Sequence, residues 1–477
     1  MLLIAAALLT ASMHSLGVVE APGVPPSAAH VVAASATVPP SSAHVVAASA
    51  TAGASSTRAA DGVHGAGATN RTSASEARAL ADADGSDFLT RLVRLDAPEL
   101  RAVSGDADVV ARVQDDPPSA TDTATWWAGL DDDQRERLER HAPVVVGCLD
   151  GVPYDVRDRA NRAVLAAGLA DHGASAAETA MLGQVQRSLV AAPGAPYRSL
   201  VTLDTRGSGR AAIAIGDLGT AADVSVVVPG MFFTVTGQMV DFTDTADDLY
   251  SEQATLAPLG QRADTSGGRS GVAVVAWMGY HTPDLSNILS LDLARTGAER
   301  LERTVSGIRS VRPDDQPRLN VVAHSYGSTM AMMALASGHM RADSLTVLGS
   351  PGSSVHSAGE LAVASGEVFV GDAHSDPIAG TGYFGTDPGA SSFGSTLLDL
   401  DPGTGVQTLG DVLRRPVGHN DYLKPGTASL HDVALIGIGR GDLVREQVRR
   451  GGGRGNGVVQ ASPDMYLVRP QDLHPRD

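Results

Sequence analysis

The residue best suited to do chemistry is Ser325, which lies in the stretch Ala323-His324-Ser325-Tyr326-Gly327. A β-branched apolar run precedes this stretch, and the helix-compatible run 329–335 follows it. A serine between small residues at a strand-to-helix turn is typical of a nucleophile elbow, in which the hydroxyl is exposed above a sheet. The pattern predicts that Ser325 is a nucleophile, with Ala323 in place of the first glycine of G-x-S-x-G. The competing interpretation is a Ser/Gly turn that only joins a strand to a helix.

A serine hydroxyl is a weak nucleophile at neutral pH, so a hydrolytic serine needs a base and an acid that orients the base. In a large class of serine hydrolases the acid and then the histidine follow the serine along the chain. We predict Asp376 as the acid, with Asp372 as the rival because it lies closer to the end of a strand. We predict His419 as the base because it lies in a polar loop beyond the strand candidate 396–400. The other histidines weighed for this role are His324, His374 and His431.

Hydrolysis also needs donors for the charge that develops on the substrate oxygen. These are commonly the backbone N–H of the residue after the serine and another from a loop after an earlier strand. Here they map to Tyr326 and to Met231, which follows the apolar run 223–228. Gly230 would let the backbone come close. The competing interpretation of Pro229-Gly230 is an ordinary turn at the end of a strand.

Short apolar runs alternate with helix-compatible segments along the middle of the chain. The runs are 223–228, 271–277, 320–323, 344–349, 367–371 and 396–400, and 200–204 and 211–215 are candidates for a leading hairpin. Continuous apolar strands separated by helices are typical of a parallel sheet that is covered on both faces. The sequence therefore predicts an α/β fold with a mostly parallel central sheet flanked by helices.

Three blocks of sequence carry a resemblance to a known family: 277–283, the elbow 323–328, and 419–423. Together they resemble the largely actinobacterial α/β-hydrolase family long labelled a domain of unknown function. The resemblance covers roughly residues 120 to 435. It implies an α/β-hydrolase fold with Ser325 as nucleophile, Asp376 as acid and His419 as base, and it supplies no substrate.

The resemblance extends to the region before the sheet. The segments 126–130, 147–153 and 157–162 look like the family's tryptophan pair, its Gly-Asn-Leu-Asp-Gly-x-Pro stretch and its Arg-Asp-x-Ala-Asn-Arg stretch. Cys148 stands where the family tends to have asparagine. We expect Trp126-Trp127 to anchor one segment to another rather than to line a cleft. Asp150 and the arginines of 157–162 would form an ionic network or face a substrate carboxylate.

Composition divides the chain of 477 residues into four parts. Residues 1–86 are an apolar leader and a low-complexity tether, because Val24–Thr37 is repeated almost identically from Val38 to Thr51 and the stretch has few large apolar groups. Residues 87–195 are expected to be helical and packed on the catalytic domain, which spans 196–445. Residues 446–477 form a Gly/Arg-rich flexible tail.

The charge balance of 36 basic against 54 acidic residues, a net charge of −18, argues against nucleic acid as a partner. One cysteine excludes an intramolecular disulfide, and no metal, nucleotide or redox motif occurs, so no cofactor is expected. Residues 1–9 resemble the core of a signal peptide, which favours export or the cell envelope over the cytoplasm. No window is long and apolar enough to predict a transmembrane helix.

These observations predict a serine hydrolase that cleaves an acyl bond, with an ester favoured, in a small-molecule or lipid-like substrate. The segment 234–268 is expected to cover the cleft and to set specificity. The alternatives are a catalytically silent, hydrolase-like binding or scaffold protein of the cell envelope, and a peptidase or acyltransferase on the same fold.

Overall fold

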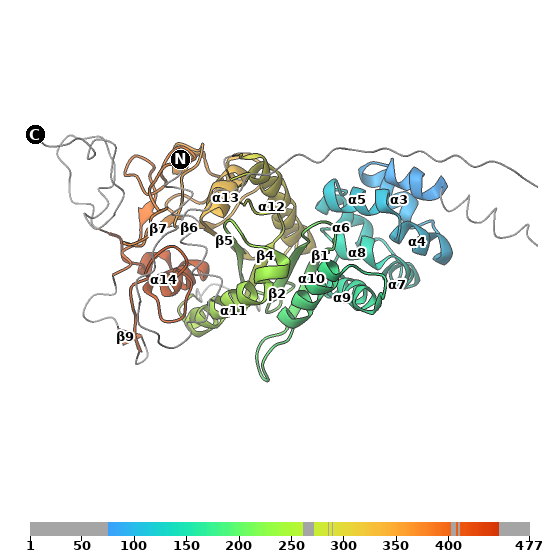
Figure 1. Ribbon diagram of the computed structural model, residues 1–477, viewed down its shortest axis with the longest axis horizontal. Helices are drawn as coiled ribbons and strands as arrows, with labels where there is room; N and C mark the ends of the chain where they lie inside the picture. Colours follow the sequence, from blue (N-terminus) through green and yellow to red (C-terminus); the bar gives the residue numbers. More distant parts are fainter. Residues whose placement is uncertain are drawn as a thin grey trace, which may run out of the picture.

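The computed structural model describes residues 75–447, apart from 261–270, 285, 289, 402–406 and 409–410 (Figure 1). The expectations for residues 1–74 and 448–477 lie outside the described residues. The proposed domain boundaries are not tested by the structure and stay predictions.

An eight-stranded sheet lies at the centre of the described chain, in the order β1-β2-β4-β3-β5-β6-β7-β8. The strands are β1 Arg198–Asp204, β2 Arg210–Ile215, β3 Asp223–Val228, β4 Val272–Met278, β5 Arg318–His324, β6 Ser344–Leu348, β7 Val368–Gly371 and β8 Thr396–Leu397. β1 pairs antiparallel with β2 and β2 with β4, whereas the pairs from β4 through β8 are parallel. The predicted mostly parallel sheet with a leading hairpin is confirmed. A separate small hairpin is formed by β9 Gln407–Thr408 and β10 Asp411–Val412.

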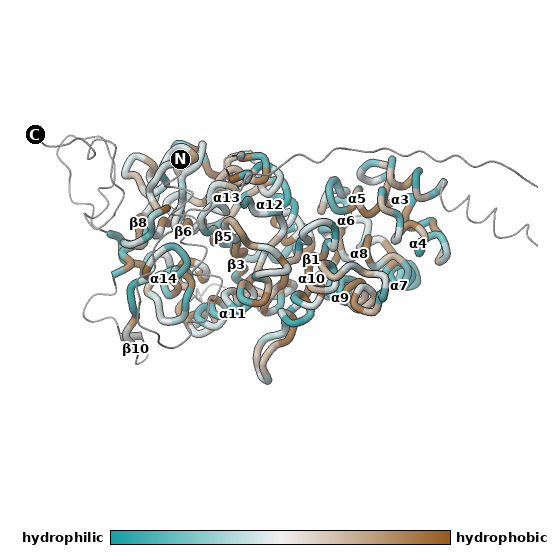
Figure 2. The backbone as a smooth tube through the Cα atoms, in the orientation of Figure 1, coloured by the Kyte–Doolittle hydropathy of each residue, from teal (hydrophilic) through white to brown (hydrophobic). Residues whose placement is uncertain are grey.

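Helices cover both faces of the sheet. The flanking helices are α10 Ala176–Ser188, α11 Val235–Gly260, α12 Asp292–Val311, α13 Tyr326–Ala336 and α14 Ala428–Gly437. Figure 1 shows α12 and α13 on one face and α11 and α14 on the other. Side chains along a strand point to alternate faces, so Val226 and Val228 belong to the core under α12 while Val227 belongs to the core under α11. Figure 2 shows the same arrangement as apolar strands between more polar outer helices.

A group of helices precedes α10 and the sheet and has an apolar core of its own. These helices are α3 Gly85–Leu92, α4 Ala97–Ser104, α5 Ala107–Asp115, α6 Ala120–Ala128, α7 Asp132–His141, α8 Pro143–Cys148 and α9 Tyr154–Ala170. Side chains of Asp96, Asp106, Ser119 and Asp131 accept hydrogen bonds from backbone N–H groups of the first turns of α4 to α7. Such caps satisfy donors that a helix start leaves free.

The tryptophan pair lies in this helical group. Trp127 is buried in its core, and the ring of Trp126 packs against that core with the two ring centroids 5.9 Å apart. The helix that carries them, α6, packs against α12. The pair thus joins segments to one another, as expected, and neither ring lines the cleft described below.

The charged residues of α9 form an ionic network that ties this helix to β1. Arg157 is buried and contacts Asp150 at 2.7 Å. Arg162 binds Asp158 at 2.8 Å, and Asp158 accepts the backbone N–H of Leu200 in β1 at 2.6 Å. Of the two alternatives left open by the sequence, the network is the one that the structure supports.

Replacing Asp150 by Asn should lower the free energy of unfolding by about 3 kcal/mol, because it leaves the charge of a buried arginine without its carboxylate. The matched control is Asp155→Asn. Asp155 also binds an arginine of α9, at 2.9 Å, but this pair is exposed, with 71% of the Asp155 side chain accessible. The control should cost less than about 1 kcal/mol. Urea denaturation measures both values, and equal losses would contradict the prediction.

Candidate active site

Ser325 lies at a sharp turn between β5 and α13. Its backbone angles, φ 54° and ψ −130°, place a non-glycine residue in the left-handed half of backbone space. Residues are held in such strained conformations only where the surrounding structure fixes them, and they gather at functional sites. Here the backbone N–H of Ser325 donates to the carbonyl of Leu348 at 2.9 Å.

Small residues are required around this turn because two backbones come close together there. A Cβ at Gly327 would lie 2.4 Å from the carbonyl oxygen of Pro229. A Cβ at Gly230 would lie 2.7 Å from the Cβ of Ser325. Distances below 3 Å cannot be accommodated without moving the chain, so glycine at both positions brings the loop after β3 against the serine. Ala323, at the position of the missing glycine, is fully buried in β5.

The three residues predicted to act together are brought together. The Oγ of Ser325 lies 2.8 Å from Nε2 of His419. The Nδ1 of His419 lies 2.9 Å from both carboxylate oxygens of Asp376. A carboxylate on Nδ1 requires a proton there, which leaves Nε2 free to accept the serine proton. The carboxylate beside the histidine is that of Asp376 and not of its rival Asp372.

Two further side chains hold this arrangement, and neither was predicted to do so. His324 donates its Nε2–H to the backbone carbonyl of His419 at 2.7 Å, with the two rings 4.6 Å apart. Burial and then the nearby His419 lower the pKa of His324 to about 3, so its ring is neutral at ordinary pH. The hydroxyl of Tyr422 donates to Asp376 at 2.7 Å and accepts the N–H of Ala373 at 2.8 Å. The spacing of three residues between His419 and Tyr422 is the signal that could have suggested this role.

Asp376 stays ionised despite being buried. Burial raises the pKa of the carboxyl, but His419, the Tyr422 hydroxyl and the N–H of Ile378 together outweigh it and lower the pKa below its usual value. The bond from Ile378 N–H to the carboxylate is 2.8 Å long. A negative charge is thereby maintained beside the histidine ring, where it would stabilise an imidazolium.

The loop after β3 contains the second predicted donor, Met231. Neither its N–H nor that of Tyr326 has an acceptor within the part of the chain that the structure describes. The next residue, Phe232, has φ 63° and gives its N–H to the carbonyl of Pro283 at 3.1 Å. The N–H of Phe232 is therefore already used and cannot bind an oxyanion. The N–H groups of Met231 and Tyr326 have no acceptor among the described residues and are available for that role.

A cleft of about 1130 Å³ opens beside His419. Its apolar wall residues are Phe233, Phe242, Pro377, Val417 and Leu423, and its polar ones include Gln238, Asp241, Thr245, Asp421 and Lys424. Pro229 and His324 also line it, so it adjoins both loops that flank Ser325. The segment expected to cover the cleft forms the 26-residue helix α11, whose first turns line it, while residues 261–270 lie outside the described residues.

The other residues singled out in the sequence lie elsewhere. His374 is exposed, and His431 binds Glu252 of α11 at 2.7 Å. Cys148 is buried in α8, and burial raises the pKa of its thiol to about 12, so it is no thiolate nucleophile. Within the described residues no group of three or more His, Cys, Asp or Glu side chains is arranged to hold a metal ion.

Comparison with known proteins identifies the family. Residues 204–386 match the family described as Alpha/beta hydrolase. The uncharacterized protein Mb0988c of Mycobacterium bovis (strain ATCC BAA-935 / AF2122/97) is 31% identical over 230 residues, which cover 46% of this chain and 83% of that protein. The chain belongs to the α/β-hydrolase family. The fold class predicted from the sequence is therefore confirmed. The narrower resemblance, drawn from individual sequence blocks, stays a prediction.

A second relative of this α/β-hydrolase is the uncharacterized protein Rv2079 of Mycobacterium tuberculosis (strain ATCC 25618 / H37Rv), 29% identical over 435 residues. The match covers 77% of this chain but 62% of the relative, so the chain spans less than two thirds of that protein. A solved fungal esterase from Rhizomucor miehei is similar with a TM-score of 0.32 and 12% identity, covering 59% of this chain and 95% of that one. A likeness this distant says nothing about the reaction.

The described helices include none that is both long enough and apolar enough to cross a bilayer.

Replacing Tyr422 by Phe should destabilise the protein by about 1–3 kcal/mol at neutral pH, because the N–H of Ala373 and the Asp376 carboxylate each lose a buried partner. The loss should shrink as the pH falls. The folded pKa of Asp376 lies below its unfolded value, so the stability its charge contributes is present above the unfolded pKa and is lost as the pH falls through the folded pKa.

The matched control is Tyr326→Phe. Tyr326 is also buried, but its hydroxyl donates to a neutral acceptor, the carbonyl of Ser290, at 2.9 Å. The cost of this control should be nearly the same at pH 3 and pH 7. Urea denaturation of both variants between these pH values measures the difference. A Tyr422→Phe cost that does not change with pH would count against the proposed contact with a charged Asp376.

Proposed function

We propose that this protein is a serine hydrolase that cleaves an ester bond through Ser325, His419 and Asp376. His419 takes the hydroxyl proton on Nε2 while Oγ attacks the carbonyl carbon of the substrate. The tetrahedral intermediate collapses, the leaving alkoxide takes the proton from His419, and an acyl-enzyme remains. A water molecule deprotonated by His419 then attacks the acyl carbon and releases the acid with Ser325 restored.

The observation that carries this proposal is the unbroken chain of hydrogen bonds from hydroxyl to imidazole to carboxylate, at 2.8 and 2.9 Å. These lengths lie within the range expected for a nucleophile and its base. A serine and a histidine at hydrogen-bond distance are common in proteins. The combination with a buried, ionised aspartate and a strained serine at a helix start is typical of serine hydrolases that act on acyl bonds.

The backbone N–H groups of Met231 and Tyr326 are proposed to bind the oxyanion. Both are donors without an acceptor in the described chain, one directly after the serine and one on the loop whose Gly230 touches Ser325. Donors that are already in place where the charge develops make the largest contribution to the rate acceleration of many such enzymes. Loss of one donor typically lowers the rate by about 100-fold to 1000-fold.

The cleft beside His419 supports a substrate with a sizeable apolar group. Phe233, Phe242 and Leu423 offer it apolar contacts, and a volume of about 1130 Å³ exceeds that of a short acyl chain. The charged side chains of the wall are of both signs, since Lys424 lines the cleft beside Asp241 and Asp421, and Asp421 is paired with Arg414. The apolar contacts therefore carry the proposal of a small-molecule or lipid-like ester whose apolar portion enters this cleft.

A fluorophosphonate probe tests the nucleophile. The wild type should be labelled covalently, and Ser325→Ala should not be labelled while its unfolding temperature stays the same. No labelling of well-folded wild type would instead support a catalytically silent, hydrolase-like binding protein.

The acid is tested by exchanging one carboxylate at a time. Asp376→Asn should lower kcat for p-nitrophenyl butyrate by about 1000-fold or more, because the amide favours the wrong tautomer of His419. Asp372→Asn is the matched control from the same loop and should stay within a few-fold of wild type. Similar activity in the two variants would refute the assignment of Asp376.

A further inference from the structure

The segment Gly279–Pro283, which follows β4, lies against the loop that carries Met231. β3 and β4 are parallel neighbours, so both segments leave the sheet at the same edge. The segment belongs to the block 277–283, to which the proposed chemistry gives no role.

Hydrogen bonds join this segment to the loop on both sides of Met231. The Tyr280 hydroxyl donates to the carbonyl of Pro229 at 2.8 Å. The Thr282 hydroxyl donates to the carbonyl of Phe233 at 2.7 Å, and the N–H of Phe232 donates to the carbonyl of Pro283 at 3.1 Å. The left-handed conformation of Phe232 is unfavourable for a side chain with a Cβ, so the loop needs such outside contacts to keep its shape.

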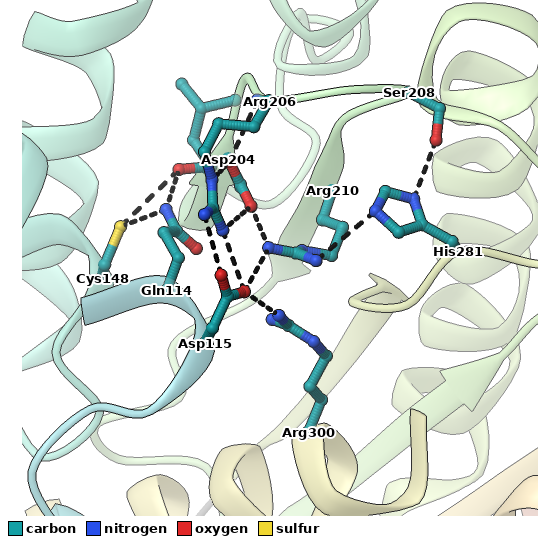
Figure 3. Close-up of polar contacts among 10 residues, drawn as sticks. Gln114, Asp115, Cys148, Asp204, Arg206, Ser208, Arg210, His281 and Arg300 are labelled. Carbon is teal, nitrogen blue, oxygen red and sulfur yellow. Dashed lines mark hydrogen bonds and ion pairs between the residues drawn. The ribbon is translucent and has the colours of Figure 1, made fainter. Parts of the chain in front are cut away.

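The middle residue of the segment, His281, points toward Ser208 and Arg210, beside a group of charged side chains (Figure 3). Its Nδ1 lies 2.8 Å from Oγ of Ser208, and its Nε2 lies 3.5 Å from Nη1 of Arg210. Burial and then Arg210 and Arg300 lower the pKa of His281. The neutral ring can accept from Arg210 at Nε2 and donate to Ser208 from Nδ1.

Arg210 connects the histidine to the helical region. Its guanidinium is bound to Asp204 of β1 and lies 3.4 Å from Asp115, the last residue of α5. Asp115 also binds Arg300 of α12 at 2.6 Å and Arg206 of the β1–β2 turn at 2.8 Å. The bond from Arg206, with further contributions from Arg300 and Arg210, lowers the pKa of Asp115 to about 2 and keeps it charged. Figure 3 shows this carboxylate among the three arginines.

We propose that Asp115, Arg210 and His281 are positioning residues that fix the oxyanion loop, so that the helices before the sheet take part in setting the reaction rate. The inference rests on the proposed function. These side chains do not touch the reacting atoms and act through a series of contacts. Asp115 of α5 contacts Arg210, and Arg210 contacts His281. The segment that contains His281 is hydrogen-bonded to Phe232 and Phe233, which follow Met231. The arginines already bind two carboxylates, which argues against the cluster being an anion site.

Hydrogen–deuterium exchange of peptides that cover residues 229–236 tests the coupling without any need for activity. His281→Ala should speed exchange there by about 10-fold, because opening becomes easier when the segment loses its outer contacts. Asp115→Asn should have a smaller effect in the same peptides.

The matched control is Asp315→Asn. Asp315 binds the guanidinium of Arg312, which is 3% exposed, much as Asp115 binds that of Arg210, which is 7% exposed. The two carboxylates are also similarly exposed, at 48% and 52%. Asp315 precedes the start of β5 and Ser325 follows its end, so the two residues lie at opposite ends of this strand. Exchange in residues 229–236 should therefore not change in Asp315→Asn.

Kinetics test the consequence for the reaction. With p-nitrophenyl butyrate, His281→Ala should lower kcat by about 10-fold to 100-fold and leave KM within a factor of two. The reason is that a misplaced oxyanion donor weakens the binding of the transition state but not that of the substrate. The affinity of an alkyl trifluoromethyl ketone, whose adduct with serine carries an oxyanion, should fall in the same proportion. His281→Gln can accept from Arg210 and should recover part of both.

The outcomes separate the two proposals. Unchanged exchange and unchanged kcat in His281→Ala would overturn the inference. If His281→Ala speeds exchange and lowers kcat, but Asp115→Asn has as little effect as Asp315→Asn, the link to α5 would be overturned. A wild type that a fluorophosphonate does not label would refute the proposed function, and the exchange data would still decide whether these residues hold the loop.

Discussion

The geometry of the site depends on the pairing of β3 with β5. Their parallel register sets Val228 opposite Ala323, so the turns that follow both strands meet at the same edge of the sheet. The loop after β3 then passes within contact distance of Ser325, which only glycine at Gly230 and Gly327 permits. A shift of this register by one residue would also exchange the faces of every buried side chain in the strand. The same packing that forms the core therefore determines where the serine lies.

The base and the acid come from loops, and loops need other means of support. In this protein the support is buried and polar: His324 holds the backbone of His419, and Tyr422 holds the carboxylate of Asp376. Buried polar groups are costly when unpaired and directional when paired. A loop fixed by such bonds can keep an imidazole within hydrogen-bond distance of a hydroxyl although no regular structure surrounds it.

The parts that could be predicted from the sequence are those with a local signal. Fully buried parallel strands are continuous apolar runs, and the chain order of serine, acid and histidine selected His419 among several histidines. Asp376 is predicted as the acid with Asp372 as its rival, because both lie in one short loop and which one reaches the ring depends on the turn that Ile378 N–H stabilises. Phe232 has no pattern that predicts its left-handed backbone. The contacts of Asp115 with Arg206 and Arg210 join residues 91 and 95 positions apart, so no spacing predicts them.

The antiparallel start of the sheet has a consequence for how the two halves of the chain are joined. Because β2 runs against β4, with Ala211 opposite Met278, the β1–β2 turn lies at the edge where the parallel strands end. That is the edge of Ser325. A parallel first pair would need a crossover instead of a tight turn. The hairpin therefore places both Arg206 and Arg210 against Asp115 of α5, and it places Arg210 against His281 in the segment after β4. This is the route by which the helices before the sheet would act on the loop that carries Met231.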